Sequence, residues 1–363
     1  MTTIDIVCTT INDGMFLASY TREIVAAGAQ NRVRMIVIPD RKTPRELYQS
    51  VQRARKHGIV VLCPDPITQA DFLLSLGVPD GTFPWDSDGR RNIGYLMAWR
   101  DGTDIMISID DDNLLGRSWL QAHEVVAEAA PHSVVSSSSG FWNPCALLES
   151  VPLTFYPRGY PYSARVRRGL IDTATYSWGE VWADVAVNAG LWIGDPDVDA
   201  VTRLAVHPET HRVTGSAVLA RHTWAPVNSQ NTAVRREAIP AYCFFESAKR
   251  FADIWQGYFV QACAKHLGQH VRFGTPVTDC AVRNDHDLLN DLRLEYDGIM
   301  MADDLLDWLT QLKLSGSTYA ETYDCLADEL IDYADSAAEP AAAILHGMVS
   351  RMQQWLKIIG QLA

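Results

Sequence analysis

The sequence predicts an α/β protein with a mainly parallel central sheet flanked by helices. Short segments rich in β-branched residues alternate with segments of helical apolar spacing through the first hundred residues. The strand segments are almost continuously apolar, which is typical of strands that helices cover on both faces. The chain has 363 residues, 47% of them hydrophobic, which is enough for a large core. In sheets of this kind, ligands bind beyond the carboxyl ends of the strands.

The elements are expected in alternating order along the chain. We expect strands at 4–10, 34–38, 59–63 and 104–109. Helices are expected between them at 15–28, 43–57, 67–77 and 92–100, and T-P-R-E at 43–46 predicts a capping box. The chain from about 131 to 235 is less periodic and rich in Ser, Pro, Gly and Trp, which favours long loops around a site. Helical spacing returns at about 236, with a strand near 270–282 and helices that include 303–313 and 341–358.

Charge, cysteine content and hydropathy narrow the class of protein. A net charge of -13 argues against a basic nucleic-acid-binding surface. The seven cysteines form no C-x-x-C pair, so we expect buried free thiols rather than a zinc site or disulfides. No apolar stretch reaches the roughly 18 residues that a membrane span needs. The sequence therefore predicts a cytoplasmic protein without a membrane span.

Three consecutive aspartates follow the strand expected at 104–109. Burying adjacent carboxylates without a partner is costly, so solvent, a basic group or a cation must compensate. In an extended segment residues two apart point the same way, so Asp110 and Asp112 can converge while Asp111 points elsewhere. Carboxylates suit Mg²⁺ or Mn²⁺, which usually bridge to substrate phosphates. The motif favours a metal and diphosphate site of a nucleotide-sugar transferase, and the alternative is a solvated acidic turn that caps a helix.

A basic loop occupies residues 155–169. Arg158 and Arg165 lie seven residues apart on either side of a turn-like G-Y-P-Y segment, and proline and glycine restrict the loop. Guanidinium groups match phosphate oxygens in a bidentate manner. The loop therefore predicts phosphate binding. The alternative is a surface loop that pairs with the acidic remainder of the protein.

Two further segments combine carboxylates with tryptophan. Residues 188–200 place carboxylates at strand spacing beside an aromatic ring, a combination common in sugar sites. The residues concerned are Trp192, Asp195, Asp197 and Asp199. In 249–258, Asp253 and Trp255 open an apolar helix, where Asp253 is a candidate base or ligand. The alternatives are an acidic turn in the first segment and, in the second, a carboxylate that the helix dipole favours.

Together these segments resemble the reversibly glycosylated polypeptide, or UDP-arabinopyranose mutase, family of glycosyltransferases. The family pattern I-D-D-D, R-G-Y-P-F-S-L-R, G-L-W-x-x-x-P-D-Y-D-A-P-T and R-Y-D-D-M-W-A-G-W is matched in order at 109–112, 158–165, 190–202 and 250–258. Residues 86–95 resemble the family's D-S-A-C-R-C-F-G-Y with one residue added, and residues 292–299 resemble L-K-K-E-Y-K-G-I. The similarity extends nearly from end to end.

The resemblance implies a GT-A-like nucleotide-diphospho-sugar transferase fold that binds a UDP-sugar with Mn²⁺ or Mg²⁺. It implies one integrated catalytic unit with a nucleotide-binding half (1–130), a sugar or acceptor half (131–283) and a C-terminal helical extension (284–363). Members of the family assemble into oligomers, so a homo-oligomer is compatible with the resemblance.

Individual roles carry over by position. Asp110 and Asp112 would hold the metal, Arg158 matches the self-glycosylated arginine, and Asp253 matches a sugar contact or base. Arg165 would hold the diphosphate or support the glycosyl intermediate. The expected nucleotide-sugar-binding residues are Thr10, Asp40, Asp86, Arg91, Asp111, Trp192, Asp195, Asp197, Asp199 and Trp255.

The chain also departs from the family. The first aspartate of D-D-M-W is Ala252 here. The family's histidine in Y-H-S-K falls near Val282 and Arg283, with His286 out of register, so one metal contact is expected to be lost. Q-D-G-D after the second strand is I-P-D-R, and R-E-G after the second arginine is R-V-R-R-G. Because of these departures the sequence does not identify the sugar that is bound. Metal binding is expected to rest on aspartates, phosphates and water.

Three functions follow from the sequence. The first is a mutase, or a self-glycosylating enzyme, that holds the sugar transiently and returns it to UDP in the other ring size. The second is a metal-dependent transferase that passes the sugar to a separate small-molecule acceptor. The third is a non-catalytic partner subunit that binds a nucleotide sugar, which the intact D-D-D motif and both arginines disfavour.

Overall fold

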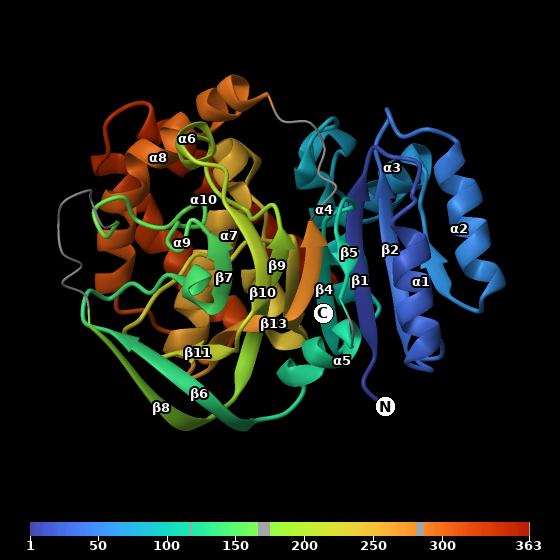
Figure 1. Ribbon diagram of the computed structural model, residues 1–363. Helices are drawn as coiled ribbons and strands as arrows, with labels where there is room; N and C mark the ends of the chain where they lie inside the picture. The colour runs from blue at the N-terminus through green and yellow to red at the C-terminus, as the bar shows by residue number, and fades with distance from the viewer. Residues whose placement is uncertain (117, 166–174, 281–286, 363) are drawn as a thin grey trace.

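Four parallel strands form the N-terminal half of the central sheet in the computed structural model, which describes residues 1–116, 118–165, 175–280 and 287–362 (Figure 1). They are β1 (Ile4–Thr10), β2 (Val33–Pro39), β3 (Val60–Leu62) and β4 (Ile105–Ile109), and they lie in the order β3-β2-β1-β4. The helices between them are α1 (Leu17–Ala26), α2 (Glu46–Lys56), α3 (Pro66–Ser75) and α4 (Arg91–Arg100). The predicted α/β class and the alternating order are confirmed.

Strand β1 shows why these strands are apolar along their whole length. Ile4, Ile6 and Cys8 belong to a core cluster that also contains residues of α1, α2 and α5 (Trp119–His123). Val7, which points the other way, belongs to a second cluster with α4 and the C-terminal helices. Because successive side chains of a strand alternate between faces, helices on both faces require apolar residues at every position.

Beyond β4 the sheet is mixed rather than mainly parallel. β12 (Asn231–Arg235) pairs antiparallel with both β4 and β9 (Val185–Gly194), and β13 (His270–Cys280) pairs parallel with β9. The sheet continues through β11 (Ala217–Leu219) and β6 (Ala130–Ser137) to β8 (Tyr176–Ala183). Off this path lie β5 (Leu114–Leu115), β7 (Leu148–Val151) and β10 (Glu209–Val213). The expectation of long loops between 131 and 235 is therefore only partly right: strands β6 to β12 lie there, with loops such as 152–165 and 220–230 between them.

The capping box expected at 43–46 does not form. Helix α2 begins at Glu46 after Arg45, whose side chain makes no capping hydrogen bond. The Thr43 hydroxyl instead donates to the carbonyl oxygen of Thr10 (2.6 Å) and accepts from the amide of Asp40 (2.8 Å). Thr43 thereby ties the carboxyl end of β1 to the loop after β2, a tertiary contact that replaces the local one.

The C-terminal helices pack on the α4 side of the sheet. They are α8 (Leu288–Gln311), α9 (Tyr319–Ser336) and α10 (Ala341–Leu362), and they share one apolar cluster with α7 (Ala252–His266) and α4. The fully buried Trp355 of α10 donates its indole N–H to the carbonyl of Pro240 (3.1 Å). The helices that the structure describes include none that is both long and apolar enough to span a bilayer. The division of the chain at 130 and 283 stays a prediction.

His123 is fully buried and makes folding dependent on pH. Its Nε2 lies 3.0 Å from Oδ1 of Asn231 and its Nδ1 lies 3.3 Å from Nδ2 of Asn188, which fits a neutral ring protonated on Nε2. Burial lowers the pKa of His123 to about 3. The unfolded chain takes up this proton below about pH 6.5 and the native chain does not until about pH 3, so stability is lost as pH falls through this window.

We expect His123→Gln to flatten the pH dependence of the free energy of unfolding between pH 3 and pH 6.5. The linked contribution reaches about 4 kcal/mol at the acid end of the window. Urea unfolding at a series of pH values measures it, and His57→Gln, at an exposed histidine, is the matched control. Parallel pH profiles for the wild type and His123→Gln would contradict this account.

Candidate functional site

A polar cleft of about 230 Å³ lies beyond the carboxyl ends of β1 and β4. It joins residues that are far apart in sequence: Thr9, Asp88, Arg91, Asp110, Asp111, Asp112, Arg158, Asp197, Ser229, Gln230, Phe244, Lys249, Arg250 and Asp253. A larger, mostly apolar cavity of about 810 Å³ lies beside α9 and α10, but the described residues that line it include no lysine or arginine to meet a phosphate. The chemistry that the sequence indicates therefore belongs to the smaller cleft.

The first two aspartates of the acidic motif point to different partners. Asp111 accepts hydrogen bonds from the Thr10 hydroxyl and from Nδ2 of Asn12 (2.9 Å) at the end of β1. Burial raises the pKa of the Asp111 carboxyl, against these two hydrogen bonds, and the charge of Asp110 adds to the rise. Asp110 instead accepts a hydrogen bond from Nη2 of Arg91 (2.9 Å). Asp111 and Thr10 therefore brace the cleft wall, while Asp110 faces the basic side.

Arg91 is a buried cation at the start of α4. Its Nη1 donates to the Ser229 hydroxyl (2.5 Å), and its Nη2 forms the ion pair with Asp110. Burial alone would lower the pKa of Arg91, but the nearby carboxylates, Asp110 foremost, hold it well above the usual value. A fixed guanidinium beside the acidic motif can contact a phosphate and keeps Asp110 in one orientation.

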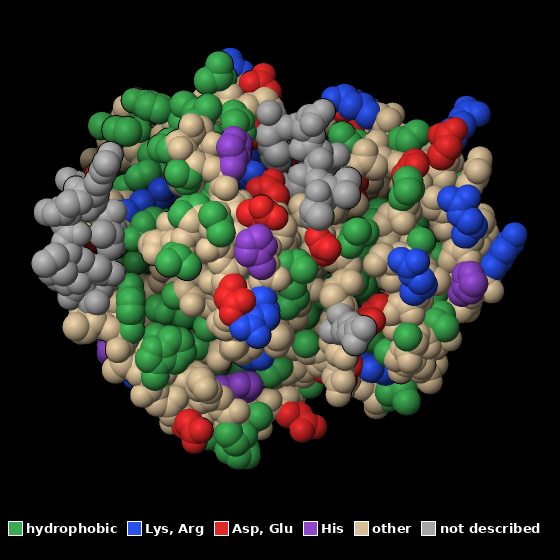
Figure 2. Space-filling view, in the orientation of Figure 1, with side chains coloured by type: hydrophobic (Ala, Val, Ile, Leu, Met, Phe, Trp, Pro, Cys, Tyr) green, Lys and Arg blue, Asp and Glu red, His purple; other side chains and the backbone are tan. Residues whose placement is uncertain are grey.

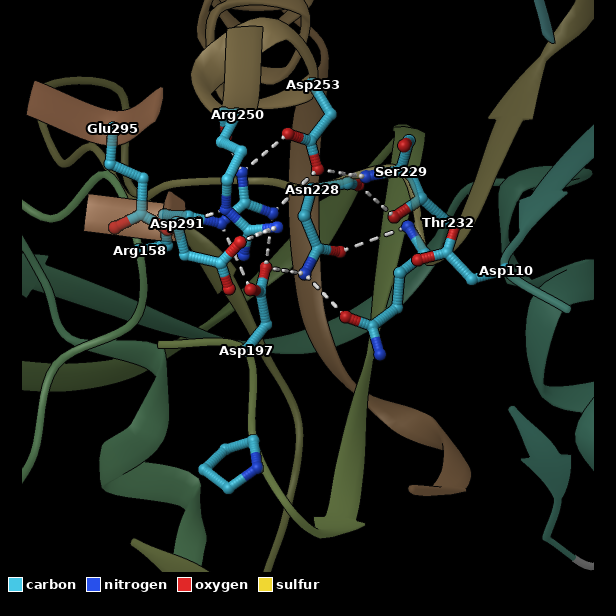
Figure 3. A network of polar contacts seen from close by, with 12 residues as sticks. Asp110, Arg158, Asp197, Asn228, Ser229, Thr232, Arg250, Asp253, Asp291 and Glu295 are labelled. Atoms are coloured by element: carbon cyan, nitrogen blue, oxygen red, sulfur yellow. Dashed lines mark hydrogen bonds and ion pairs between the residues drawn. The ribbon is translucent and has the colours of Figure 1, made fainter. Parts of the chain in front are cut away.

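Arg158 is held between two carboxylates (Figure 3). Its Nε and Nη2 donate to the two oxygens of Asp197 at 3.1 and 3.0 Å, and its Nη1 and Nη2 donate to the two oxygens of Asp253 at 2.9 and 3.2 Å. Nη1 also donates to the carbonyl of Arg250. Burial opposes the charge of Arg158, but Asp197 and Asp253 outweigh it and hold its pKa well above the usual value. Arg158 is therefore charged and fixed, and it can become a nucleophile only if one of its protons leaves.

Arg158, Asp197 and Asp253 together form an arginine clamp, and local structure positions it. Gly159 has φ +81°, and a Cβ there would lie 2.3 Å from the Ile254 side chain, so only glycine allows the turn that follows Arg158. Asp253 lies in the first turn of α7. Nδ2 of Asn228 donates to Oδ2 of Asp197 (2.8 Å), the oxygen that also accepts from Nη2 of Arg158, and so helps to fix that carboxylate. The turn, the helix start and Asn228 together set the geometry.

Two further basic residues line the cleft, and helix α8 pairs with both. Nζ of Lys249 lies 2.8 Å from Asp297. Nε of Arg250 lies 2.9 Å from Glu295, and the same side chain reaches Asp291 at 3.4 Å (Figure 3). Lys249 has φ +50° and ψ −124°, a strained conformation for a residue with a side chain. Helix α8 therefore supports the cleft wall directly.

Several residues that the sequence motifs predict as site residues do not line the cleft. Arg165 pairs with Asp199 (2.6 Å), which also caps α6 (Ala200–Ala205) by accepting from the amide of Thr202 (2.7 Å). Asp195 pairs with Arg203 (2.6 Å). Trp255 is fully buried among aromatic rings, whereas Trp192 is buried beside a 20 Å³ cavity that Arg158 and Asp197 also line. These side chains contact other protein groups here, and the expected roles of Arg165, Asp195, Asp199 and Trp255 at the site stay predictions.

Asp40 and Asp86 organise the loop beside the cleft. Oδ2 of Asp40 accepts from the amide of Asp86 (2.8 Å), and Oδ1 accepts from the amide of Arg41 (2.5 Å). Both residues lie near Trp85, whose ring is covered by the guanidinium groups of Arg41 and Arg90 at 4.4 and 3.2 Å. These contacts hold the loop after β2 against the segment that contains Trp85 and Asp86, next to the end of β1.

The donor set fits a hard divalent cation that arrives with phosphate. Asp110 and Asp112 both line the cleft and offer carboxylate oxygens. Within the described ranges, no three His, Cys, Asp or Glu side chains form a group that could hold a metal. A Mg²⁺ or Mn²⁺ ion would therefore take two protein carboxylates and complete its shell with phosphate and water oxygens. Val282, Arg283 and His286, where the sequence comparison placed the lost histidine, lie outside the described residues.

Sequence comparisons with known proteins indicate one family. Residues 3–363 match the sequence model of the family described as reversibly glycosylated polypeptide. UDP-arabinopyranose mutase 1 of Arabidopsis thaliana is 29% identical over 168 residues, 44% of this chain and 42% of that protein. UDP-arabinopyranose mutase 2 of Arabidopsis thaliana is 27% identical, with 66% of this chain and 63% of that protein covered. These alignments span less than two thirds of either relative.

Among solved structures, the chain resembles the mannosyltransferase PcManGT from Pyrobaculum calidifontis in complex with GDP-Man and Mn²⁺. The identity is 12%, the TM-score is 0.42, and the match covers 99% of this chain and 84% of that chain. Glucosyl-3-phosphoglycerate synthase from Mycobacterium tuberculosis in complex with UDP is 13% identical with a TM-score of 0.41, covering 87% of this chain and 82% of that one.

Proposed function

The chain belongs to the reversibly glycosylated polypeptide family, and on that basis we propose that its cleft binds a UDP-sugar and that Arg158 carries the sugar transiently. The observation that carries this proposal is the arginine clamp opposite the acidic motif in a single cleft. The motif and Arg91 would meet the diphosphate, and Arg158 would lie beside the anomeric carbon. The product would be UDP bonded to the same sugar in the other ring size.

Such a reaction first requires that the negative charge developing on the leaving UDP be stabilised. A divalent cation at Asp110 and Asp112 would supply Lewis-acid stabilisation of the diphosphate. Arg91 is already fixed and charged beside Asp110, so it needs no rearrangement as negative charge develops. Thr10 and Asn12 hold Asp111 at the cleft wall and keep the motif in shape.

Transfer to Arg158 needs a proton acceptor. The bond from the anomeric carbon to the UDP oxygen breaks and the electron pair leaves with UDP. A bond from Nη1 of Arg158 to the anomeric carbon forms, and the proton of Nη1 passes to Asp253, 2.9 Å away.

While the sugar is held on Nη1, the bond from the anomeric carbon to the ring oxygen breaks as the nitrogen lone pair forms a C=N bond, and the ring oxygen takes up a proton. A different sugar hydroxyl then bonds to the anomeric carbon, loses its proton and closes the other ring. In the reverse of the first step UDP bonds to the anomeric carbon, the bond to Nη1 breaks, and Nη1 recovers its proton from Asp253. Asp197 keeps its hydrogen bonds to Nε and Nη2 throughout and so holds the guanidinium in place.

The replacement of a family aspartate by Ala252 gives little support for transfer to a separate small acceptor. Ala252 is buried at the start of α7 and does not line the cleft, so the missing carboxylate does not widen the site. A non-catalytic role is disfavoured because both the acidic motif and the arginine clamp are complete.

The test mixes the protein with Mn²⁺ and a panel of UDP-pentoses and UDP-hexoses. We expect a mass increase of one sugar by intact-protein mass spectrometry and a ring-contracted or ring-expanded product by NMR. Release of UDP that requires an added acceptor would favour the transferase instead. Absence of both protein labelling and ring-changed product across the panel would exclude the mutase.

A further inference from the structure

The two edges of the central sheet differ in how they are protected. At one edge, β3 has only three residues, and Nη2 of Arg55 donates to the carbonyl of Val61 (2.7 Å), which occupies an edge acceptor. At the other edge, β8 has eight residues and pairs, within the described part of the chain, with β6 alone. Short length and a capping arginine are devices that prevent edge-to-edge pairing, and β8 has neither.

Strand β8 also exposes aromatic side chains. Tyr176, Trp178 and Trp182 are 37%, 55% and 69% exposed, and their even numbers place them on one face of the strand. Hydrophobic side chains are visible over this part of the molecule in Figure 2. The sequence of β8 (YSWGEVWA) contains no lysine or proline, the residues that commonly mark a protected edge. An eight-residue edge strand with exposed aromatic side chains indicates a partner strand.

The charge distribution favours a second copy of this chain at this edge. The protein carries a net charge of -13, and residues 288–363 hold thirteen acidic against four basic side chains, so most of the net negative charge lies in the C-terminal helices. Strand β8 contains one charged residue, Glu180. Two copies that meet through β8 therefore bring together a region that is nearly free of charge.

We propose that β8 pairs antiparallel with β8 of a second copy, with Gly179 opposite Gly179 of the partner subunit. A two-fold axis normal to the sheet keeps each face on its own side, so only residues of the same parity can lie opposite one another. In this register Tyr176 lies opposite Trp182 of the partner subunit, and Trp178 lies opposite Glu180 of the partner subunit. A shift by one residue in each strand would instead place Glu180 opposite its own copy, which is unfavourable.

Sedimentation velocity over a wide range of concentration tests the proposal, which does not depend on the proposed function. We expect a dimer of twice the 40.4 kDa chain mass. Trp182→Glu is expected to raise the dissociation constant about tenfold or more, because the cross-strand pair occurs twice. Adding Tyr176→Lys to Trp182→Glu is expected to recover dimerisation through two Lys–Glu pairs. A monomer at all concentrations, or a dimer that Trp182→Glu leaves intact, would overturn the proposal.

Cysteine substitution tests the register directly. Opposite residues of antiparallel strands have Cα atoms about 4.5–5.5 Å apart, within the range that a disulfide spans. We expect Gly179→Cys to form an intermolecular disulfide under mild oxidation, and a Cβ at this position meets only ordinary contact with Val134 (3.6 Å). Glu180→Cys is the matched control and is expected not to cross-link, and the wild type gives the baseline for the seven native free cysteines. Cross-linking of Glu180→Cys in preference to Gly179→Cys would refute this register.

Discussion

Replacing Arg158 with lysine is expected to abolish covalent labelling by a UDP-sugar while lowering the free energy of unfolding by only about 1–2 kcal/mol. Lysine keeps a positive charge between Asp197 and Asp253, so neither carboxylate is left without a cation. It cannot reproduce the two bidentate contacts, because its three donors radiate from one atom. The proposed glycosyl acceptor, a guanidinium nitrogen, is absent. Function and stability should therefore separate in this variant.

Arg158→Ala is expected to be far more destabilising. The side chains of Asp197 and Asp253 are only 7% and 12% exposed, so removing the guanidinium takes away the cation that both carboxylates share and leaves them little access to solvent. Breaking a buried pair in this way typically lowers stability by roughly 3–5 kcal/mol. The stability differences are measured by urea unfolding and the labelling by intact-protein mass spectrometry.

The matched control is Arg203, another buried arginine paired with an aspartate but outside the cleft lining. Arg203→Lys is expected to keep full labelling, with a stability loss similar to or smaller than that of Arg158→Lys, because Asp195 is 34% exposed and can be solvated. Retention of sugar labelling in Arg158→Lys would show that another residue carries the sugar. Equal loss of labelling in the two lysine variants would point to a general structural effect.

The sequence predicted those parts of the fold and the candidate site that depend on local pattern. Alternating apolar segments located β1 to β4 because these strands are covered on both faces. The pattern failed between 131 and 235 because strands such as β8 and β10 are partly exposed, so polar residues interrupt the apolar periodicity. The capping box failed because a tertiary contact of Thr43 with Thr10 replaced it.

For individual side chains of the site, what the sequence could predict differed from residue to residue. Asp110 and Asp253 follow from their places at a strand end and a helix start, which local sequence reveals. Arg165 shares a loop with Arg158, but its guanidinium pairs with Asp199, and spacing along a loop does not say where each side chain turns. Asn12, Ser229, Lys249 and Arg250 reach the site through contacts between segments distant in the chain, and no local motif marks them. Only the resemblance at 292–299 hinted at Glu295, which holds Arg250.

Asp112→Ala is expected to lower turnover of a UDP-sugar by about 100- to 1,000-fold, the usual effect of removing one group that stabilises developing charge. Removing one of three adjacent carboxylates relieves repulsion, which offsets the loss of the contacts that Asp112 itself makes. The free energy of unfolding without metal should therefore change little. Asp104→Asn is the matched control, since Asp104 precedes β4 at its other end and binds Thr3 rather than the cleft. Unchanged turnover in Asp112→Ala would remove the metal site from the mechanism.

Metal binding itself gives a sharper measurement than turnover. With two protein carboxylates, the site should bind Mn²⁺ weakly alone and much more tightly when UDP supplies phosphate oxygens. By linkage, the factor by which UDP tightens Mn²⁺ binding must equal the factor by which Mn²⁺ tightens UDP binding. Titration calorimetry of each ligand with and without the other measures both factors. In Asp112→Ala both should fall toward one together, whereas loss of UDP affinity without loss of the coupling would assign Asp112 to the nucleotide rather than to the metal.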